Sequence, residues 1–389
     1  MAETATYAIS DAEAARYRAE FPIFEHTTYL NSCSLGPLSS RSTTALEQYA
    51  NAWSNFGAPA WWEEWLPKID KAKARFARLI GAGDHEVTVS HSISSALSSV
   101  ASAFDYSARR RVVCADLDFP TIPYQWMAKE RDGVQVAFAR SLDGIRTPPT
   151  AYEQHVDGNT ALIATSHVFY TTGAIQPIRA LADLAHAHGA KLIVDGYHSV
   201  GVFPVDVKAL DVDIYVGGVL KWLLGGPGLT FIYVREGLIE ELHPAVTGWF
   251  AAADQFAFDA QRLALASDAD RFQLGTPAMP TVYTGIAGMD MILEVDPQRI
   301  ADRLRMLTSR LVEHAVHGGF TVLSPDDPEE RGGIVMLGLE KPERTVADLA
   351  AKHFTVDHRP GRVRISPHFY NTIDDVDRLM EALLRTQQT

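Results

Sequence analysis

One short segment, residues 191–234, constrains the fold of this chain more than any other. The apolar run at residues 192–194 ends at Asp195, and a second apolar run at residues 214–216 is followed by two glycines and then by Lys221. Both runs have the length and composition of buried strands. Lys221 is a lone cation among apolar residues, and a turn rich in glycine follows it. The segment therefore predicts two buried strands, with a carboxylate at the end of one and a lysine just past the other.

A lysine and an aspartate placed in this way have a specific chemical use. Apolar surroundings lower the pKa of a lysine, which makes its amine a better nucleophile and base. Pyridoxal phosphate needs such an amine to form its Schiff base, and it needs an acid to keep a proton on its pyridine nitrogen. Taken singly, Asp195 could cap a helix and Lys221 could lie on the surface. Together, with glycines on both sides of the lysine, they favour a pyridoxal phosphate site.

Strands and helices alternate before this segment. Strands are expected at residues 86–89, 112–114, 134–138 and 161–165, and helices at residues 40–56, 123–130 and 180–188. A further helix follows residues 90–95 and runs to residue 104. Such alternation is typical of a mostly parallel sheet covered by helices, and ligands bind such sheets at the carboxyl ends of the strands. Asp195 falls at such an end.

The pattern changes after residue 276. Longer helices are expected at residues 282–293, 296–317 and 374–385, with short strands at residues 320–323, 333–339 and 363–365. This pattern indicates a smaller α+β domain. We therefore expect an N-terminal arm with a substrate loop (1–40), a large cofactor-binding domain (41–280) and a small C-terminal domain (281–389).

Charge and composition exclude several classes of function. The net charge of −13 at pH 7 argues against nucleic acid or an anionic membrane as a partner. Two cysteines give no disulfide framework, and no apolar run approaches the ~20 residues of a membrane helix. The N-terminal residues lack the cationic start and apolar core of a signal peptide. We therefore expect a cytoplasmic protein with a small-molecule substrate.

Seven short motifs, in order along the chain, resemble the class V aminotransferase family, which has fold type I of the pyridoxal phosphate enzymes, and within it the kynureninases. The motifs are residues 29–37, 118–121, 166–173, the segment around Lys221, 248–249, 275–277 and 364–371. The resemblance covers nearly the whole chain. It implies an α/β enzyme with pyridoxal 5'-phosphate as cofactor, a mostly parallel sheet flanked by helices, and a smaller C-terminal α+β domain.

The resemblance also implies roles for individual residues. Lys221 would carry the cofactor and then act as base at the substrate α-carbon, while Asp195 would pair with the pyridinium. Phe119 would stack on the ring, a flat apolar face against a flat π-system. The remaining implied cofactor contacts are His167, His198 and Trp249, together with Thr276, which the partner subunit of a homodimer would donate to the phosphate.

The phosphate has a second expected contact where residues 90–95 lead into the helix that runs to residue 104. Ser94 and Ser95 lie where free backbone N–H groups, hydroxyl donors and the positive end of the helix dipole suit a phosphate. Serines that only cap the helix would look the same in the sequence. Since members of the family bind the phosphate at this turn, we expect both serines to contact it.

The substrate carboxylate is expected at the C-terminal motif. Arg364 resembles the arginine that grips this carboxylate through a two-pronged, charge-assisted contact, and Arg362 and Arg359 are near enough to do so instead. The resemblance of the loop at residues 29–37 implies that Asn31 and Ser34 also contact the substrate.

Three positions depart from the kynureninase pattern. Leu220, Ile122 and Phe169 stand where kynureninases have tyrosine, aspartate and asparagine, so polar groups are lost and kynurenine need not be the substrate. Cysteine desulfurases need a mobile cysteine late in the chain, and residues 353–364 contain none. Cys33, in the N-terminal loop, is expected to be a packed small thiol.

These expectations describe an enzyme that acts on an α-amino acid through an aldimine and a quinonoid. A kynureninase-like C–C lyase or a C–S lyase is the first expectation. An aminotransferase, or an epimerase resembling isopenicillin-N epimerase, would use the same site up to the quinonoid. A third interpretation is a non-catalytic protein of the same fold, but a scaffold has no need for the pair of Lys221 and Asp195.

Overall fold

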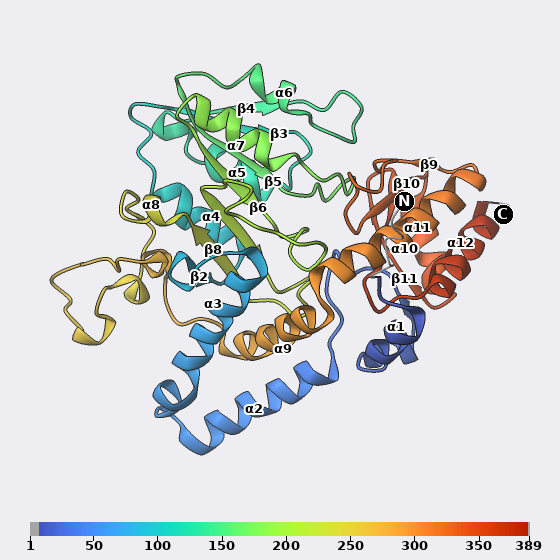
Figure 1. Cartoon of the computed structure of the whole chain (residues 1–389), viewed down its shortest axis with the longest axis horizontal. Coiled ribbons are helices and arrows are strands. Elements are labelled where there is room, and N and C mark those ends of the chain that lie inside the picture. The colour runs from blue at the N-terminus through green and yellow to red at the C-terminus, as the bar shows by residue number, and fades with distance from the viewer. Residues whose placement is uncertain (1–7, 388–389) are drawn as a thin grey trace, which may run out of the picture.

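The computed structural model describes residues 8–387 and contains a large mixed sheet and a small sheet, each with its own helices (Figure 1). The strand order of the large sheet is β2-β8-β7-β6-β5-β3-β4. In this order the strands are Val87–Ser90, Thr230–Val234, Ile214–Gly218, Lys191–Asp195, Thr160–Ser166, Arg111–Ala115 and Gln135–Ala139. All neighbours are parallel except β8, which is antiparallel to both of its neighbours. The expected parallel sheet is thus present, and β8 is a strand that the sequence patterns did not predict.

Helices cover both faces of the large sheet. Alternate residues of each central strand point to opposite faces: Ile193 packs with α4 (Ile93–Ser102) and α5 (Thr121–Met127), while Leu192 and Val194 pack with the elements of the other face. That other face is covered by α3 (Leu66–Ile80), α7 (Ile178–Ala187) and α9 (Met279–Val295). Burial on both faces explains why the central strands read as continuous apolar runs.

The small sheet is antiparallel, with strand order β12-β13-β10-β9. These strands are Asp357–Arg359, Arg362–Ile365, Val335–Gly338 and Thr321–Val322, and the helices α10 (Pro297–His317), α11 (Pro342–Ala350) and α12 (Ile373–Gln387) share one core with them. The sequence patterns did not predict β12 or α11. A separate parallel pair, β1 (Thr28–Tyr29) with β11 (Phe354–Thr355), ties the N-terminal arm to this part of the chain.

The helix bounds agree with the sequence patterns to different degrees. α2 (Ser40–Phe56) has the expected bounds, with Ser39 as its N-cap. α5 begins at Thr121 rather than at Pro123, because proline is tolerated anywhere in the first helical turn. Among the helices of residues 8–387, none combines the length and the apolar character needed to cross a bilayer.

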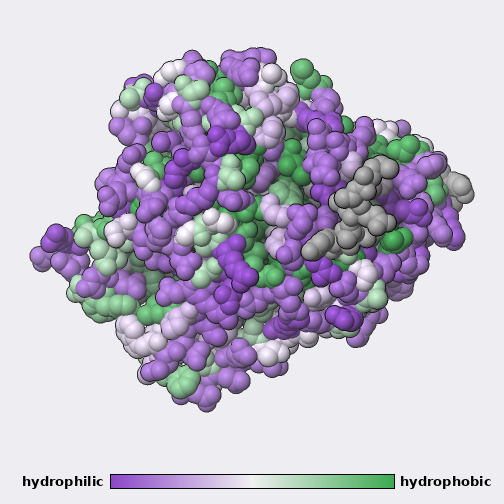
Figure 2. Space-filling view, in the orientation of Figure 1, coloured by the Kyte–Doolittle hydropathy of each residue, from purple (hydrophilic) through white to green (hydrophobic). Residues whose placement is uncertain are grey.

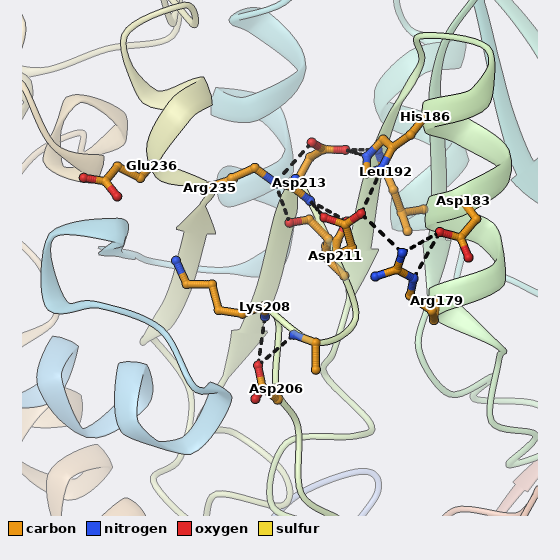
Figure 3. Close-up of polar contacts among 12 residues, drawn as sticks. Arg179, Asp183, His186, Leu192, Asp206, Lys208, Asp211, Asp213, Arg235 and Glu236 are labelled. Atoms are coloured by element: carbon orange, nitrogen blue, oxygen red, sulfur yellow. Dashed lines mark hydrogen bonds and ion pairs between the residues drawn. The ribbon is translucent and has the colours of Figure 1, made fainter.

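A polar network lies at the amino-terminal end of the central strands of the large sheet (Figure 3). Asp213, just before β7, accepts a hydrogen bond from the backbone N–H of Leu192 at 2.8 Å and contacts His186 Nε2 at 2.7 Å. Arg235, just after β8, lies 3.5 Å from the same carboxylate and also pairs with Asp211. The network therefore joins α7, β6, β7 and β8 through one buried carboxylate, at the end of the strands opposite to Asp195.

We expect Asp213→Asn to lower the free energy of unfolding by about 2 kcal/mol, because the amide loses charge-assisted hydrogen bonds in a buried site. The Asp213 side chain is only 2% exposed. Asp183→Asn is the matched control, since Asp183 forms an exposed helical pair with Arg179 and should cost about 0.5 kcal/mol or less. Denaturant titration of the two variants measures the difference, and equal losses would contradict the structural role of Asp213.

Candidate active site

Strands β5, β6 and β7 bring the central residues of the site to one edge of the large sheet. Asp195 is the last residue of β6 and lies beside Ser166 at the end of β5 and beside Val216 in β7. Lys221 follows three residues after β7 ends. The carboxyl ends of the parallel strands therefore carry both residues, as the sequence patterns predicted.

The Lys221 amine lies in a partly buried environment with two ring contacts. Its Nζ is 2.9 Å from His198 Nε2 and 4.5 Å from the centre of the Tyr197 ring. Burial lowers the pKa of Lys221 to about 8, and the positive charges of Arg364 and Arg359 act in the same direction. About one tenth of this amine is therefore unprotonated at pH 7 and about half of it at pH 8, and this fraction can act as nucleophile and base.

The hydrogen bonds of His198 fix which of its nitrogens carries the proton. The indole N–H of Trp222, which can only donate, points to His198 Nδ1 at 3.2 Å. Burial holds the pKa of His198 well below its usual range, with the positive charge of Lys221 acting in the same direction, so the ring is neutral. We therefore assign the proton to Nε2, which faces the Lys221 amine. A bond from this N–H needs a lone pair on Nζ, which agrees with an unprotonated lysine.

Asp195 has one oxygen in use and one available. Its Oδ1 accepts the backbone N–H of Tyr197 at 2.8 Å, which turns the chain as it leaves β6. Within residues 8–387 no hydrogen-bond donor contacts the second oxygen. Burial raises the pKa of Asp195 to about 6. A carboxylate in this setting is suited to bind a protonated ring nitrogen, whose charge would offset the cost of burial.

The N-terminal loop packs directly on the lysine segment. The Gly36 backbone N–H donates to the carbonyl of Leu220 at 2.9 Å, and a Cβ at Gly36 would lie 2.2 Å from the Lys221 carbonyl oxygen. Only glycine permits this close approach. Ser34 accepts a hydrogen bond from Arg364 Nη2 at 2.7 Å, and Asn31 forms an isolated bridge with Ser366, so the loop also contacts the C-terminal motif. Cys33 is fully buried, as expected for a packed thiol.

Tyr170 contacts both Phe119 and Arg364. The rings of Phe119 and Tyr170 are in edge contact at 5.1 Å, and Arg364 Nη1 donates to the Tyr170 carbonyl at 3.5 Å. The Phe119 ring is 44% exposed, which leaves it free to contact a further group. Arg364 is 1% exposed, and its Nε has no hydrogen-bond partner among the described residues. Arg362, the alternative to Arg364, donates to the Thr171 carbonyl at 3.0 Å.

Ser94 and Ser95, at the start of α4, have different contacts. Ser95 completes a capping box with Ser92, and its hydroxyl also contacts Ser90 at 2.9 Å. The Ser94 hydroxyl lies 3.4 Å from that of Thr121 at the start of α5. Thr276 is near the same turn of the same chain, because its carbonyl contacts His91 Nε2 at 2.9 Å. These residues and the free amides of α4 gather in one place.

Two of the expected cofactor contacts have other partners. The His167 ring is buried, contacts the Tyr215 hydroxyl at 2.9 Å and packs edge-on against Phe203. Burial lowers the pKa of His167 to about 3. Its backbone N–H donates to the Asp195 carbonyl at 2.8 Å, so it lies directly behind the site. Trp249 donates to the Gln255 carbonyl, and no contact joins it to Lys221 within residues 8–387.

Four site residues were missed as contacts by the sequence patterns: Tyr197, Trp222, Tyr170 and Asp357. Tyr197 and Trp222 are direct neighbours of predicted residues, so their position in the chain was a usable signal. The position of Asp357 in the chain gave no such signal, because Asp357 contacts Arg364 only through the pairing of β12 with β13. The replaced positions Ile122 and Phe169 are fully buried, and their side chains belong to the two cores.

Comparison with known proteins agrees with this geometry. The sequence model of the aminotransferase class V family matches residues 40–379. An uncharacterized aminotransferase of Bacillus subtilis, YcbU, is 33% identical over 368 residues, covering 95% of this chain and 96% of that protein. A kynureninase of Deinococcus radiodurans is 32% identical over 351 residues, covering 86% of this chain and 83% of that protein.

Solved structures with the same fold include pyridoxal phosphate proteins. An apo cysteine desulfurase of Thermococcus onnurineus superposes with a TM-score of 0.87 at 20% identity, covering 96% of this chain and 98% of the other. A variant of C-DES, a cystine C–S lyase, with glycine covalently linked to its pyridoxal phosphate also gives 0.87, at 18% identity and 94% and 98% coverage. At these identities the likeness establishes the fold alone.

Proposed function

The chain belongs to the aminotransferase class V family, and we propose that it is a lyase that cleaves an α-amino acid with pyridoxal phosphate as its cofactor. The family establishes a pyridoxal-phosphate-dependent enzyme, either an aminotransferase or a lyase. The observation that carries the proposal is the contact of the Lys221 amine with neutral His198, beside an aspartate that has one oxygen free.

The residues of the site fit this cofactor. The available oxygen of Asp195 suits the ring nitrogen, the exposed face of Phe119 suits the ring, and the free amides of α4 with Ser94 suit the phosphate. The Ser95 backbone N–H already donates to the Ser92 hydroxyl at 3.1 Å, so Ser95 would hold the turn in shape for the phosphate. When bound, pyridoxal phosphate supplies an electron sink for the bond broken at the substrate α-carbon.

Each side chain near the lysine then has a task of its own. Lys221 would hold the cofactor aldehyde, and after exchange with the substrate amine it would take the proton from the α-carbon. His198 would keep its Nε2–H directed at this place, since Trp222 occupies Nδ1. Asp195 would hold the proton on the ring nitrogen. The tight contact of Gly36 with the lysine segment keeps the N-terminal loop closed over this side of the site.

The orphaned Nε of Arg364 supports a carboxylate ligand at this arginine. A buried guanidinium N–H without a partner is costly, and an α-carboxylate would satisfy it with a charge-assisted hydrogen bond. Asn31 and Ser34 would lie beside the same carboxylate. This arrangement agrees with an α-amino acid as substrate, with its amino group toward Lys221.

The choice between a lyase and an aminotransferase is open to a direct test. The kynureninase relatives support a lyase, while YcbU supports an aminotransferase. The holoenzyme is incubated with single amino acids, with and without a 2-oxo acid. A lyase consumes its amino acid and releases alanine or pyruvate without the oxo acid. Consumption that needs the oxo acid in equal amount would overturn the proposal in favour of the aminotransferase, and inversion of configuration alone would favour an epimerase.

The lowered pKa of Lys221 predicts how fast cofactor-free protein captures pyridoxal phosphate at different pH. Only the unprotonated amine reacts, so the rate should rise with pH and reach half of its maximum near pH 8, the pKa of Lys221. Stopped-flow absorbance at a series of pH values measures this rate. A midpoint near 10.5, the ordinary value for lysine, would contradict the buried environment of the amine.

We also propose that the enzyme is a homodimer, joined partly through the segment that projects at the left of Figures 1 and 2. This segment, residues 249–265, carries the exposed side chains of Phe258 and Leu263, and Phe256 packs on the exposed Trp62. Phe258 is 72% exposed and has a φ of 49°, which is strained for an aromatic residue. The Phe258 ring stacks on Trp249 and contacts Phe256, and a cluster of exposed aromatic rings suits a second copy of the chain.

Light scattering tests the dimer. Phe258→Asp should shift the holoenzyme toward monomer, because a carboxylate in an apolar interface is desolvated without a partner. Leu142→Asp is the control, since Leu142 is 96% exposed in a distant loop and should leave the mass unchanged. A monomeric wild-type enzyme at micromolar concentration would overturn this proposal.

A further inference from the structure

Asp357 lies in the part of the site that would receive the substrate carboxylate. It stands directly opposite Arg364 in the antiparallel pair of β12 and β13. Its Oδ2 accepts hydrogen bonds from Arg364 Nη2 at 2.5 Å and from the Ser34 hydroxyl at 2.6 Å. Ser34 also accepts a bond from the same Nη2 at 2.7 Å. The strongest candidate for binding a carboxylate is thus already paired with one carboxylate of the protein.

The same carboxylate contacts a second arginine. Arg359 Nη1 lies 3.0 Å from each oxygen of Asp357. Both arginines help to lower the pKa of Lys221, so both act electrostatically on the position where the chemistry occurs. Arg362, the third arginine of this hairpin, donates to the Thr171 carbonyl and makes no contact with Asp357.

The balance of charge follows from these contacts. Burial opposes ionisation of Asp357, yet the Ser34 hydroxyl, Arg364 and Arg359 together lower its pKa to about 2. Asp357 is therefore negative at any working pH. It offsets one of the two guanidinium charges that it contacts, and one positive charge is left to meet a ligand. Nη2 of Arg364 is occupied, whereas its Nε is free.

We propose that Asp357 is a specificity-determining residue, which restricts this site to α-amino acids without a second carboxylate. A second carboxylate on the substrate would lie near Asp357 and be repelled by its charge. Without Asp357, Arg359 would be free to bind that second carboxylate. The inference rests on the proposed function, in which Arg364 binds the α-carboxylate. It adds the substrate class: amino acids with a single carboxylate are accepted, and dicarboxylic amino acids are rejected by a like charge.

Isosteric pairs of amino acids test the proposal. L-glutamine with L-glutamate, and L-asparagine with L-aspartate, differ by one charge at nearly equal shape. The holoenzyme is titrated with each, and the change in cofactor absorbance gives four dissociation constants. For the wild-type enzyme we expect tighter binding of the amides. In Asp357→Asn the ratio of acid to amide affinity should rise by about tenfold or more, as expected when a partly buried like charge is removed.

A second substitution separates charge from mere structural support. Adding Arg359→Gln to Asp357→Asn restores one net positive charge, so the affinity ratio should return to within about threefold of the wild-type value. Arg359→Gln alone should shift the ratio further toward the amides, which keeps the test valid if Asp357→Asn folds poorly. Asp377→Asn is the matched control, because Asp377 also contacts two basic side chains, Arg310 and His314 of α10.

The possible outcomes distinguish the specificity role of Asp357 from the amino acid site itself. An unchanged affinity ratio in Asp357→Asn, or a double variant that fails to reverse it, would overturn the specificity role and leave the proposed function intact. A holoenzyme with covalently bound cofactor whose spectrum responds to none of the four amino acids would overturn the amino acid site itself, and the inference with it.

Discussion

Lys221→Ala is expected to abolish the absorbance band at roughly 400–430 nm that pyridoxal phosphate shows when it is linked to a lysine amine. It should also lower the rate of amino acid turnover by about 10⁴-fold or more, because the variant loses both the covalent attachment and the base at the α-carbon. The substitution removes a partly buried amine whose polar partner is His198, so the fold should survive it.

The control for this prediction is Lys352→Ala. Lys352 is exposed at the end of α11, away from the large sheet, and its replacement should leave the band and the turnover unchanged. Absorbance of the purified, reconstituted proteins gives the first measurement, and amino acid consumption gives the second. A normal band in Lys221→Ala would show that the cofactor is held elsewhere.

Asp195→Asn is expected to lower turnover by about 10³-fold while the cofactor stays covalently bound. Asparagine can still accept the Tyr197 N–H, so the turn after β6 is kept, but an amide cannot hold a proton on the ring nitrogen. The loss should therefore appear in kcat and in exchange of the substrate α-hydrogen with deuterated water. Cofactor absorbance at saturating concentration confirms occupancy.

Asp213→Asn is the matched control for Asp195→Asn. Asp213 is also a buried carboxylate beside the central strands, but it lies at their opposite end, within the network of Figure 3. Its variant should lose stability while the turnover per bound cofactor stays within about threefold of the wild-type value. An equal loss of turnover in both variants would mean that the effect of Asp195 is structural.

The sequence was sufficient where function coincides with regular strands. Asp195 ends one buried apolar run and Lys221 follows another, and the structure has both at one edge of the sheet because the carboxyl ends of parallel strands meet there. The same reasoning gave the mostly parallel sheet and its helical cover. It did not give β8, because a short apolar run cannot be told from a buried helical segment by its pattern alone.

Contacts between distant segments could not be predicted in this way. The pairing of Asp357 with Arg364 depends on a short, charged hairpin without apolar alternation, and Ser34 joins it from the other end of the chain. The contact of Trp222 with His198 depends on how the turn after β7 folds back over that after β6. These contacts set the protonation of the lysine and the charge of the carboxylate pocket. They follow from tertiary packing.

Reduction of the holoenzyme with borohydride, followed by peptide mass mapping, identifies the lysine that carries the cofactor. Borohydride makes the link between cofactor and lysine permanent, so the modified peptide identifies the attachment point. We expect one phosphopyridoxyl group per chain, on Lys221. A group on any other lysine, or none on a protein that has taken up the cofactor, would contradict it.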